Sequence, residues 1–168
     1  AYSDSGKVED LVEKAPLAEG VLGMVVKHHP PPHVAQKYRI PKIWKGDLES
    51  DTGKALLACD DNGPTIMMCV NMTIDPAAGP VAIGRLFSGT IKDGQTINII
   101  DTKREGRVQS VNFFMSNVRE QVGELGAGNI PALLGLTDVR AGQTISTVKD
   151  IPVFEASKYV SEPVVQMA

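Results

Sequence analysis

The sequence predicts a mainly β fold, a small sandwich or barrel, preceded by short helices. From Thr65 onward, short apolar runs alternate with Gly, Asp and Asn turns at roughly ten-residue spacing, a pattern typical of small all-β domains. Aromatic residues make up only 5% of the chain against 42% hydrophobic residues overall. The core must therefore be built from Val, Ile, Leu and Met, and at 168 residues the chain is long enough to bury one.

Two helices are expected at the start of the chain. Residues 4–15 and 17–28 each place apolar residues on one face at helical spacing, and Pro16 separates them. The run Pro30-Pro31-Pro32 ends the second helix, because proline lacks an amide donor and disfavours a helical residue before it. Two such short helices make a poor core alone, so we expect them to pack on something outside this chain.

Residues 33–63 show no clear periodicity. The segment Ile40–Asp47 is interpreted as an extended linker, and residues 48–61 are polar around a small apolar island. The sequence Asp61-Asn62-Gly63-Pro64 is a strong turn signal before the β region.

Seven apolar runs are predicted to be strands. The turn Lys92-Asp93-Gly94 is tight, because glycine can adopt a positive φ, and residues 102–106 form a longer hairpin. The tetrapeptide Gly-Gln-Thr-Ile occurs at 94–97 and 142–145, each time after a turn and before a strand, which suggests a pseudo-repeat. The runs are Thr65–Asp75, Val81–Ile91, Gln95–Asp101, Gly106–Met115, Val118–Leu125, Asn129–Leu136 and Gln143–Val148.

Composition excludes several classes of protein. A net charge of −3 argues against a generally basic nucleic-acid-binding protein, although local basic patches remain possible. Cys59 and Cys69 form no C-x-x-C motif, so reduced, packed thiols are expected, with a disulfide or metal role as the alternative. No apolar run reaches the ~18 residues of a membrane span, and no secretion leader is expected. Both ends read as parts of something longer.

The sequence contains no catalytic constellation that we can identify. The nearest match to a phosphate loop, residues 1–8, has Ala1 where glycine is needed and Val8 where a hydroxyl would hold magnesium. The histidines at 28, 29 and 33 lack a fourth metal ligand, so solvated residues at a helix end are expected. No serine lies in a G-x-S-x-G motif.

Arg85 departs from the alternation of its strand. Strict alternation places it with Val81, Ile83 and Phe87 on one face, where an unpaired guanidinium would be costly. Either Gly84 marks a bulge that resets the alternation, or this face lies at an exposed rim that meets a partner. The basic hairpin at 103–107 could likewise contact phosphates, or be a solvated tip.

These residues carry a resemblance to a known family. The stretch 82–90, followed by Gly94, resembles the second-domain barrel of the translation GTPases, and residues 127–130, 135–136 and 142–145 are similar to the second half of that signature. Outside the barrel, residues 35–39, 45–47 and 159–165 resemble the elongation factor G/elongation factor 2 family. The short hairpin after Asp101 is similar to that of archaeal members.

The resemblance implies a fold and a division of the chain. The fold would be a closed six-stranded antiparallel β-barrel of the translation-factor second-domain type. Residues 1–33 would be the last helices of a GTPase domain, 34–62 a linker, 63–152 the barrel, and 153–168 the start of a third domain. The structural signature would comprise Gly84, Gly89, Gly94, Gly128, Asn129, Gly135 and Gly142.

The resemblance also implies a role. The parent would be a cytoplasmic, ribosome-dependent translocation GTPase that uses GTP and magnesium, whereas this chain would be monomeric, non-catalytic and without a cofactor. Its partners would be small-subunit ribosomal RNA, the GTPase domain and the third domain. A tRNA-delivery or release-type factor and a flavin-binding barrel are the alternatives. The candidate RNA contacts, several added on charge alone, are Arg85, Ser88, Lys92, Lys103, Arg104 and Arg107.

Overall fold

The computed structural model describes residues 16–76, 78–115 and 118–155, and the chain divides into two compact units at Pro31/Pro32. In the first unit, the predicted helix at 17–28 is confirmed as α2 (Leu17–His28), which buries none of its residues. The backbone amide of His29 closes its last turn on the carbonyl of Val25, before the prolines. The predicted helix at 4–15 lies outside the described residues.

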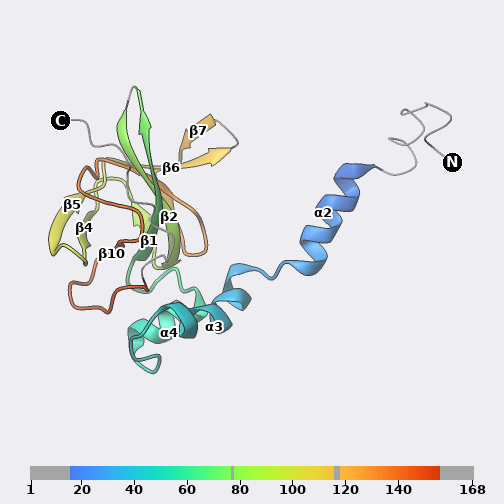
Figure 1. The fold of residues 1–168 in the computed structure, drawn as a ribbon, viewed down its shortest axis with the longest axis horizontal. Coiled ribbons are helices and arrows are strands. Elements are labelled where there is room, and N and C mark those ends of the chain that lie inside the picture. Colours follow the sequence, from blue (N-terminus) through green and yellow to red (C-terminus); the bar gives the residue numbers. More distant parts are fainter. Residues whose placement is uncertain (1–15, 77, 116–117, 156–168) are drawn as a thin grey trace, which may run out of the picture. The chain divides into compact units, whose positions relative to one another are not determined.

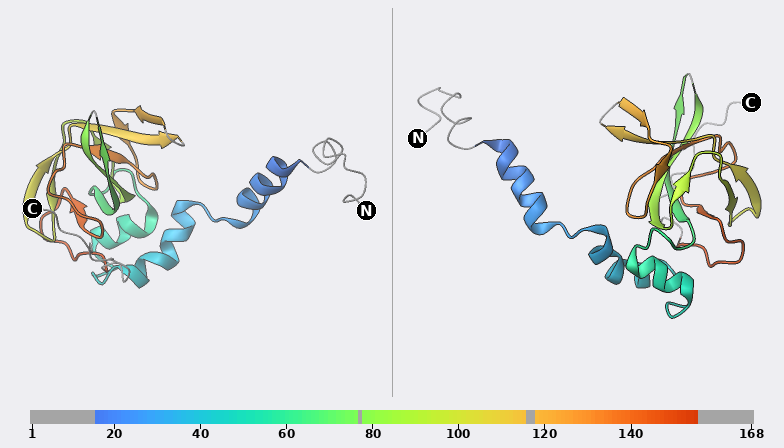
Figure 2. Two further views of the ribbon diagram at one scale, coloured as in Figure 1. Left: turned by 45° about the horizontal axis from the view of Figure 1, so that its top comes forward. Right: turned by 180° about the vertical axis from the view of Figure 1, so that it is seen from behind.

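The second unit is mainly β, with two helices at one end of an antiparallel sheet (Figures 1 and 2). Eight strands pair in the order β5-β4-β10-β1-β2-β9-β6-β7, and β3 pairs with β8. The elements are α3 (Pro32–Ile43), α4 (Asp51–Ala58), β1 (Ile66–Asp75), β2 (Gly79–Ser88), β3 (Ile91–Lys92), β4 (Thr96–Ile99), β5 (Arg104–Arg107), β6 (Ser110–Met115), β7 (Val118–Gln121), β8 (Glu124–Leu125), β9 (Ala132–Leu134) and β10 (Thr144–Ser146).

The predicted closed barrel of six strands is confirmed only as a mainly antiparallel β fold. Among the described strands, no ladder joins the two ends of the eight-stranded sheet, β5 and β7, so the sheet is not closed. Three of the predicted runs, 81–91, 106–115 and 118–125, are each divided between two strands. Beside the β3–β8 pair, the Asp93 amide donates to the Gly123 carbonyl over 2.8 Å.

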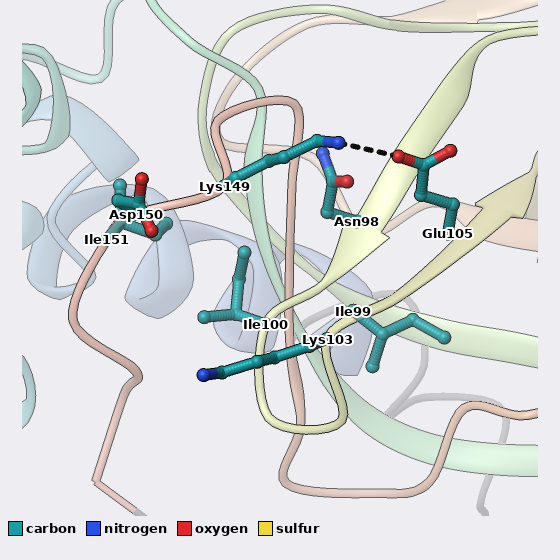
Figure 3. Close-up of a pocket in the computed structure, with 8 residues that line it drawn as sticks. All are labelled: Asn98, Ile99, Ile100, Lys103, Glu105, Lys149, Asp150 and Ile151. Atoms are coloured by element: carbon teal, nitrogen blue, oxygen red, sulfur yellow. Dashed lines mark hydrogen bonds and ion pairs between the residues drawn. The ribbon is translucent and has the colours of Figure 1, made fainter.

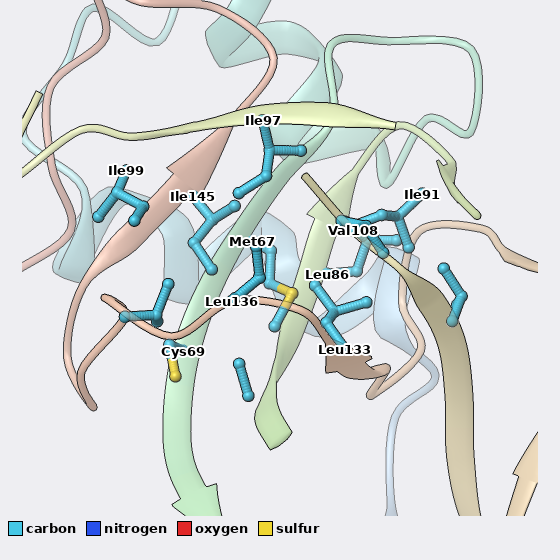
Figure 4. Close-up of a cluster of buried hydrophobic side chains, with 13 residues drawn as sticks. Met67, Cys69, Leu86, Ile91, Ile97, Ile99, Val108, Leu133, Leu136 and Ile145 are labelled. Carbon is cyan, nitrogen blue, oxygen red and sulfur yellow. The ribbon is translucent and has the colours of Figure 1, made fainter. Parts of the chain in front are cut away.

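One aliphatic core fills the interior of the sheet (Figure 4). Its members come from strands distant in sequence, for example Met67 in β1, Leu86 in β2 and Leu133 in β9, all fully buried. At about 25 cal/mol per Å² of apolar surface, such burial is the main favourable contribution to folding. The expectation that the core would rely on aliphatic and methionine side chains is met by these residues.

The interpretation of residues 40–47 as an extended linker is wrong. Helix α3 runs through Pro41, whose ring is tolerated close to the helix end, and begins at Pro32, where a missing amide costs nothing. Helix α4 is capped by Ser50, whose hydroxyl accepts from the Gly53 amide over 3.1 Å. Only Gln36 and Ile40 of α3 are buried, whereas the apolar residues Val34 and Tyr38 are exposed, so the helix shows no regular apolar face in its sequence.

A second core explains why these helices form. Ile40 and Trp44 pack with Leu56 of α4 and with Phe87 of β2, and Phe154 lies 4.7 Å from Phe87 between ring centroids. Residues 151–155 are held there too, because the Trp44 indole donates to the Pro152 carbonyl over 2.8 Å. The helices are therefore stabilised by burial against the sheet rather than by their own propensity. The expected assignment of 34–62 and 153–168 to separate domains stays a prediction.

The pseudo-repeat is a repeated structure. Gly94 and Gly142 both have a positive φ, of 75° and 92°, which glycine adopts at little cost. In each copy the amide of the following glutamine donates over 3.2 Å to the carbonyl three residues earlier, closing a tight turn. Its side-chain oxygen accepts from the amide of that same residue, Lys92 in one copy and Arg140 in the other. The two following strands, β4 and β10, pair with each other.

Candidate nucleic-acid interface

The signature strand β2 keeps its alternation from Val81 to Leu86. Ala82 and Leu86 belong to the interior core, whereas Val81 and Ile83 pack on the outer face. The bulge considered at Gly84 is not found there: Val70 is the extra residue in β1, and Phe87 is the extra residue in β2. Gly84 pairs with Cys69, and the strands lie so close there that a Cβ at position 84 would meet the Met68 carbonyl. Arg85 therefore faces outward with its apolar neighbours.

The Arg85 side chain is half-buried on that outer face. Burial lowers the pKa of its guanidinium, while the nearby Cys59 thiol raises that pKa and the nearby Arg39 lowers it. No ion pair joins Arg85 to an acidic side chain among the residues that the structure describes. A desolvated cation beside a second arginine attracts an anion, so the environment of Arg85 favours the second explanation, a rim that meets a partner.

A G1 bulge shapes the segment beside Arg85. The Gly128 amide donates to the Leu86 carbonyl over 2.8 Å, and the Leu86 amide donates to the Asn129 carbonyl over 3.1 Å. Gly128 has a φ of 85°, as the first residue of such a bulge requires. Asp61 supports this segment by accepting from the Ala127 amide over 2.6 Å. Gly128 and Asn129 of the predicted signature therefore hold one wall of the Arg85 site.

A pocket of about 440 Å³ opens at Arg85. The ladder registers place Ile83 of β2 opposite Ala132 of β9, and Ala132 opposite Asn112 of β6. Two residues further along each strand, Arg85, Ile130 and Phe114 therefore share one row. Phe114 and Ile130 carry no local signal in the sequence, because only the register of three strands brings them to Arg85. The lining residues are Arg85, Phe113, Phe114, Leu125, Gly128, Asn129 and Ile130.

Ser88 lies in the interior rather than on this surface. It is 0% exposed, and its hydroxyl donates to the Pro64 carbonyl over 2.6 Å. The neighbouring Gly89 has a φ of 74°, and its amide donates to the Asp60 carbonyl over 2.7 Å. Ser88 and Gly89 thus fasten the end of β2 to the turn that precedes β1, and in this conformation Ser88 has no surface to offer a partner.

The basic hairpin β4–β5 forms, with Ile99 opposite Arg104 and Lys103 at the tip with a φ of 54°. Two of the predicted contact residues already have carboxylate partners at the surface. Arg104 lies 3.2 Å from Asp138, and Lys92 lies 2.8 Å from Glu124. Exposed pairs of this kind contribute about 0–1 kcal/mol, so either cation is available to a phosphate.

Lys103 and Arg107 have no carboxylate partner among the described residues. Arg107 is fixed by a donor bond from its Nε to the Gly94 carbonyl, over 3.2 Å. Its remaining guanidinium donors face solvent, since the side chain belongs to an exposed residue. The hairpin therefore presents two uncompensated cations, whereas the Arg85 pocket presents one in a partly apolar setting.

A second pocket, of about 380 Å³, lies between this hairpin and residues 149–151 (Figure 3). Lys149 donates to Glu105 over 2.7 Å across it, and Lys103 extends along its lower side. The ion pair lowers the pKa of Glu105 and raises that of Lys149. The positive charge of Lys149 in this pocket is thus partly compensated by Glu105.

The described residues offer no site for a resident metal. No three His, Cys, Asp or Glu side chains come together among them, the histidines at 28, 29 and 33 included. Cys59 and Cys69 are both free thiols, and burial raises the pKa of Cys69 to about 11. No helix in the described part of the chain is long and apolar enough to cross a membrane.

Comparison with known proteins identifies the module. Residues 79–146 match the family described as elongation factor Tu domain 2, so the chain carries a second domain of the translation-factor type. Over its whole length the chain is 79% identical to elongation factor 2 of Cenarchaeum symbiosum. It is 48% identical over 163 residues to elongation factor 2 of Archaeoglobus fulgidus, and 47% identical over 168 residues to that of Methanocaldococcus jannaschii.

The chain is thus similar over its whole length to elongation factor 2 of archaea, and the predicted resemblance to archaeal members of that family is confirmed. These alignments cover 100%, 97% and 99% of the chain but only 23%, 22% and 23% of the relatives. The chain therefore spans about a quarter of the length of the relatives it matches.

Proposed function

We propose that this chain is a non-catalytic segment, centred on the second domain, of a ribosome-dependent translocation GTPase that acts in translation elongation. The observation that carries the proposal is the 79% identity over the whole chain to an elongation factor 2. The repeated Gly-Gln bulges and the Gly128 bulge support it, because they give the signature residues a structural role. In the complete factor, other segments bind GTP and magnesium and hydrolyse the nucleotide.

In the complete factor, this segment would pack on the GTPase domain and contact small-subunit ribosomal RNA. Helix α2 leaves Leu17, Leu22 and Val26 at least 63% exposed, and these residues would pack on the GTPase domain. The sheet would contact small-subunit ribosomal RNA through Arg85, Lys103 and Arg107, with Lys92 and Arg104 exchanging their carboxylates for phosphates. A monomer in the cytoplasm follows from this role. The expected absence of GTP binding follows too, because the sequence has neither a phosphate loop nor a guanine-reading motif.

Binding to archaeal small ribosomal subunits tests the contact. The 168-residue chain is sedimented with the subunits at several salt concentrations, beside a K103Q/R107Q double variant and a K54Q control in α4. We expect the double variant to bind more weakly and to lower the slope of log K against log salt by roughly 1.4–1.8, because two phosphate contacts are lost. K54Q should bind like the unaltered chain.

A second experiment tests the proposal that this chain is non-catalytic and that other segments of the factor bind GTP. Equilibrium dialysis of the 168-residue chain with GTP and magnesium should show no binding in the micromolar range. In a complete archaeal elongation factor 2, the same double substitution should lower ribosome-stimulated GTP hydrolysis more than intrinsic hydrolysis. Equal losses of both rates would contradict the proposed RNA contact, and micromolar GTP binding by the chain would contradict its non-catalytic role.

A further inference from the structure

Glycine follows an asparagine or aspartate at two places in the chain, Asn62-Gly63 and Asp93-Gly94. In such dipeptides the main-chain nitrogen of the glycine can attack the side-chain carbonyl carbon of the residue before it, because glycine has no Cβ to shield that nitrogen or to restrict its backbone. An asparagine reacts more readily than an ionised aspartate, since its neutral amide is the better electrophile. The structure holds the two dipeptides in different ways.

The dipeptide Asp93-Gly94 is held on both sides of the bond that would form. The Asp93 carboxylate accepts from the Val111 amide and from Nε2 of Gln121. The Gly94 amide donates to the Val108 carbonyl over 2.8 Å. This nitrogen cannot turn toward the carboxyl carbon without breaking a short hydrogen bond, so the fold protects the dipeptide.

The dipeptide Asn62-Gly63 is held much less firmly. Asn62 is exposed, and its side chain makes no hydrogen bond with another residue that the structure describes. Its main-chain amide donates to the Asp60 carboxylate over 2.9 Å, which leaves the side-chain amide free to rotate. The Gly63 amide donates to the Asp60 carbonyl over 3.4 Å, longer than a typical N–H···O bond. The attacking nitrogen is therefore only weakly restrained.

Packing requires a glycine after Asn62. An added Cβ at Gly63 would lie 2.8 Å from the Cβ of Ala55 in α4, closer than two such atoms approach in proteins. Ala55 itself is buried against this turn. The contact between the turn and α4 thus depends on a residue without a side chain, and that residue leaves a reactive dipeptide exposed to water.

The same turn fastens the end of β2 and the loop before β9. The Asp60 carbonyl accepts from the Gly89 amide over 2.7 Å, and the Asp61 carbonyl accepts from the Thr90 hydroxyl over 2.9 Å. The Asp61 carboxylate accepts from the Ala127 amide over 2.6 Å. These bonds depend on the path of the backbone through the turn, so both attachments would be disturbed if the backbone there became longer.

We propose that Asn62 is a site of spontaneous deamidation, which converts it to aspartate and isoaspartate and loosens the turn. The Gly63 nitrogen gives its proton to a base in the solvent and forms a bond to Cγ of Asn62. The bond from Cγ to the side-chain nitrogen breaks, and ammonia leaves with a proton from the solvent. Water then opens the cyclic succinimide. Attack at Cγ gives aspartate, whereas attack at the main-chain carbonyl carbon gives isoaspartate, whose backbone runs through the side-chain methylene. Water is the only co-reactant, and nothing is oxidised or reduced.

Peptide mapping by mass spectrometry tests the site. The 168-residue chain is incubated at neutral and mildly alkaline pH in water enriched in heavy oxygen, folded or in urea, beside N62Q. In the folded chain we expect the Asn62 peptide to take up heavy oxygen at a rate that rises with hydroxide concentration, and to become a substrate for an isoaspartyl methyltransferase. N62Q should not be labelled at this position, because glutamine would have to form a larger ring.

Three other residues serve as internal controls. Asn71 and Asn129 are exposed but precede Met72 and Ile130, so they should remain amides over the same period. Asp93 should take up heavy oxygen in urea and not in the folded chain, because only the fold holds the Gly94 nitrogen away.

Hydrogen exchange measures the loosening. The isoaspartyl form is separated by chromatography and compared with fresh chain and with N62D. We expect the amides of Gly89 and Ala127 to exchange faster in the isoaspartyl form and its urea midpoint to fall, because the added methylene displaces their acceptors. N62D carries the new charge on a backbone of normal length, so it should exchange like fresh chain.

The inference goes beyond the proposed function and is tested without any partner. If the Asn62 peptide is unlabelled in the folded chain but labelled in urea, or if Asn71 and Asn129 react as fast, the deamidation site is refuted. If isoaspartate forms but Gly89 and Ala127 stay as protected as in N62D, the loosening is refuted. The proposed contact with small ribosomal subunits stands in either case, because it is measured on freshly prepared chain.

Discussion

The amide of Gly142 donates to the carbonyl of Cys69 over 2.7 Å, and the Cys69 amide donates to the Gln143 carbonyl over 2.9 Å. The same pair of bonds joins Gly94 and Gln95 to Val108, and Gly128 and Asn129 to Leu86. Each bulge therefore sets a positive-φ glycine opposite a fully buried core residue. Bulges increase the local twist of a strand, which is how a short sheet curves around one core.

Replacing Gly142 with alanine should destabilise the domain by about 1–2 kcal/mol, because the left-handed conformation costs an alanine roughly that much. The loss would come from the backbone alone, since an added Cβ at Gly142 meets no atom within 4 Å. Urea unfolding followed by circular dichroism measures it. G142N is the matched control and should lose less, because asparagine tolerates this conformation. An alanine variant as stable as the unaltered chain would disprove the need for glycine at this bulge.

Substituting Gly84 with alanine tests close packing rather than backbone conformation. Its φ is not positive, but a Cβ would collide with the Met68 carbonyl and with the Met67 side chain. We expect a loss of about 1–3 kcal/mol in unfolding free energy, because overpacking at a backbone contact forces β1 and β2 apart. G20A in α2 is the control, as that added methyl meets nothing within 4 Å and favours the helix. If the thermal unfolding midpoint of G84A equals or exceeds that of the unaltered chain, the two strands can adjust to the added methyl group.

The strands could be predicted from the sequence because their signals are local. Alternation and turn residues placed β1 to within one residue and β2 to within three, and the repeat at Gly94 and Gly142 corresponds to two similar turns. Helix α3 was not predicted, because its one fully buried apolar residue, Ile40, packs in a core that Phe87 and Phe154 complete. No local pattern reports contacts to residues 47 or more positions away.

The candidate site was only partly predictable for the same reason. Arg85 stood out because it violated an apolar alternation, which is a local signal. Phe114 and Ile130 reach it only through the registers of β2, β9 and β6, and registers are a product of the whole sheet. Ser88 was included by its place in the motif, yet its hydroxyl serves the Pro64 carbonyl inside the fold.

Gln36 connects α3 to the rest of the second unit. It is 2% exposed, and its Nε2 donates to the carbonyls of Leu56 and Phe87, the latter over 2.9 Å. Leucine at this position should cost about 2–4 kcal/mol, because two buried carbonyls lose their donor. The Q36E variant should be nearly as destabilised at pH 7 and partly recovered at low pH, where a protonated carboxyl can donate one bond. Urea midpoints of both variants at pH 4.5 and 7 would reveal any departure from this order.

The ion pair between Lys149 and Glu105 should matter little to stability. Both side chains are well exposed, at 69% and 58%, and the pair spans the second pocket. Because pairing lowers the pKa of Glu105, its small contribution is present above the unfolded pKa and is lost as pH falls through the folded pKa. K149Q should therefore change the urea midpoint slightly at pH 7 and not at all at pH 2, which two titrations compare. A large effect at either pH would mean that the segment at 149–151 depends on the pair.

Cys69 should make the fold sensitive to alkali. Burial raises the pKa of its thiol to about 11, from a value near 9 in the unfolded chain. A raised pKa in the folded state means that the contribution is complete below the unfolded pKa and disappears as pH rises through the folded value. Relative to C69A, the unaltered chain should thus lose about 2–3 kcal/mol of unfolding free energy between pH 8.5 and 11, as a shift of about two pKa units implies. Urea unfolding of both proteins under reducing conditions across that range measures the difference, with C59A as a control that retains the buried thiol. A constant difference between the unaltered chain and C69A would show that the folded domain accommodates the thiolate beside the Gly142 bulge.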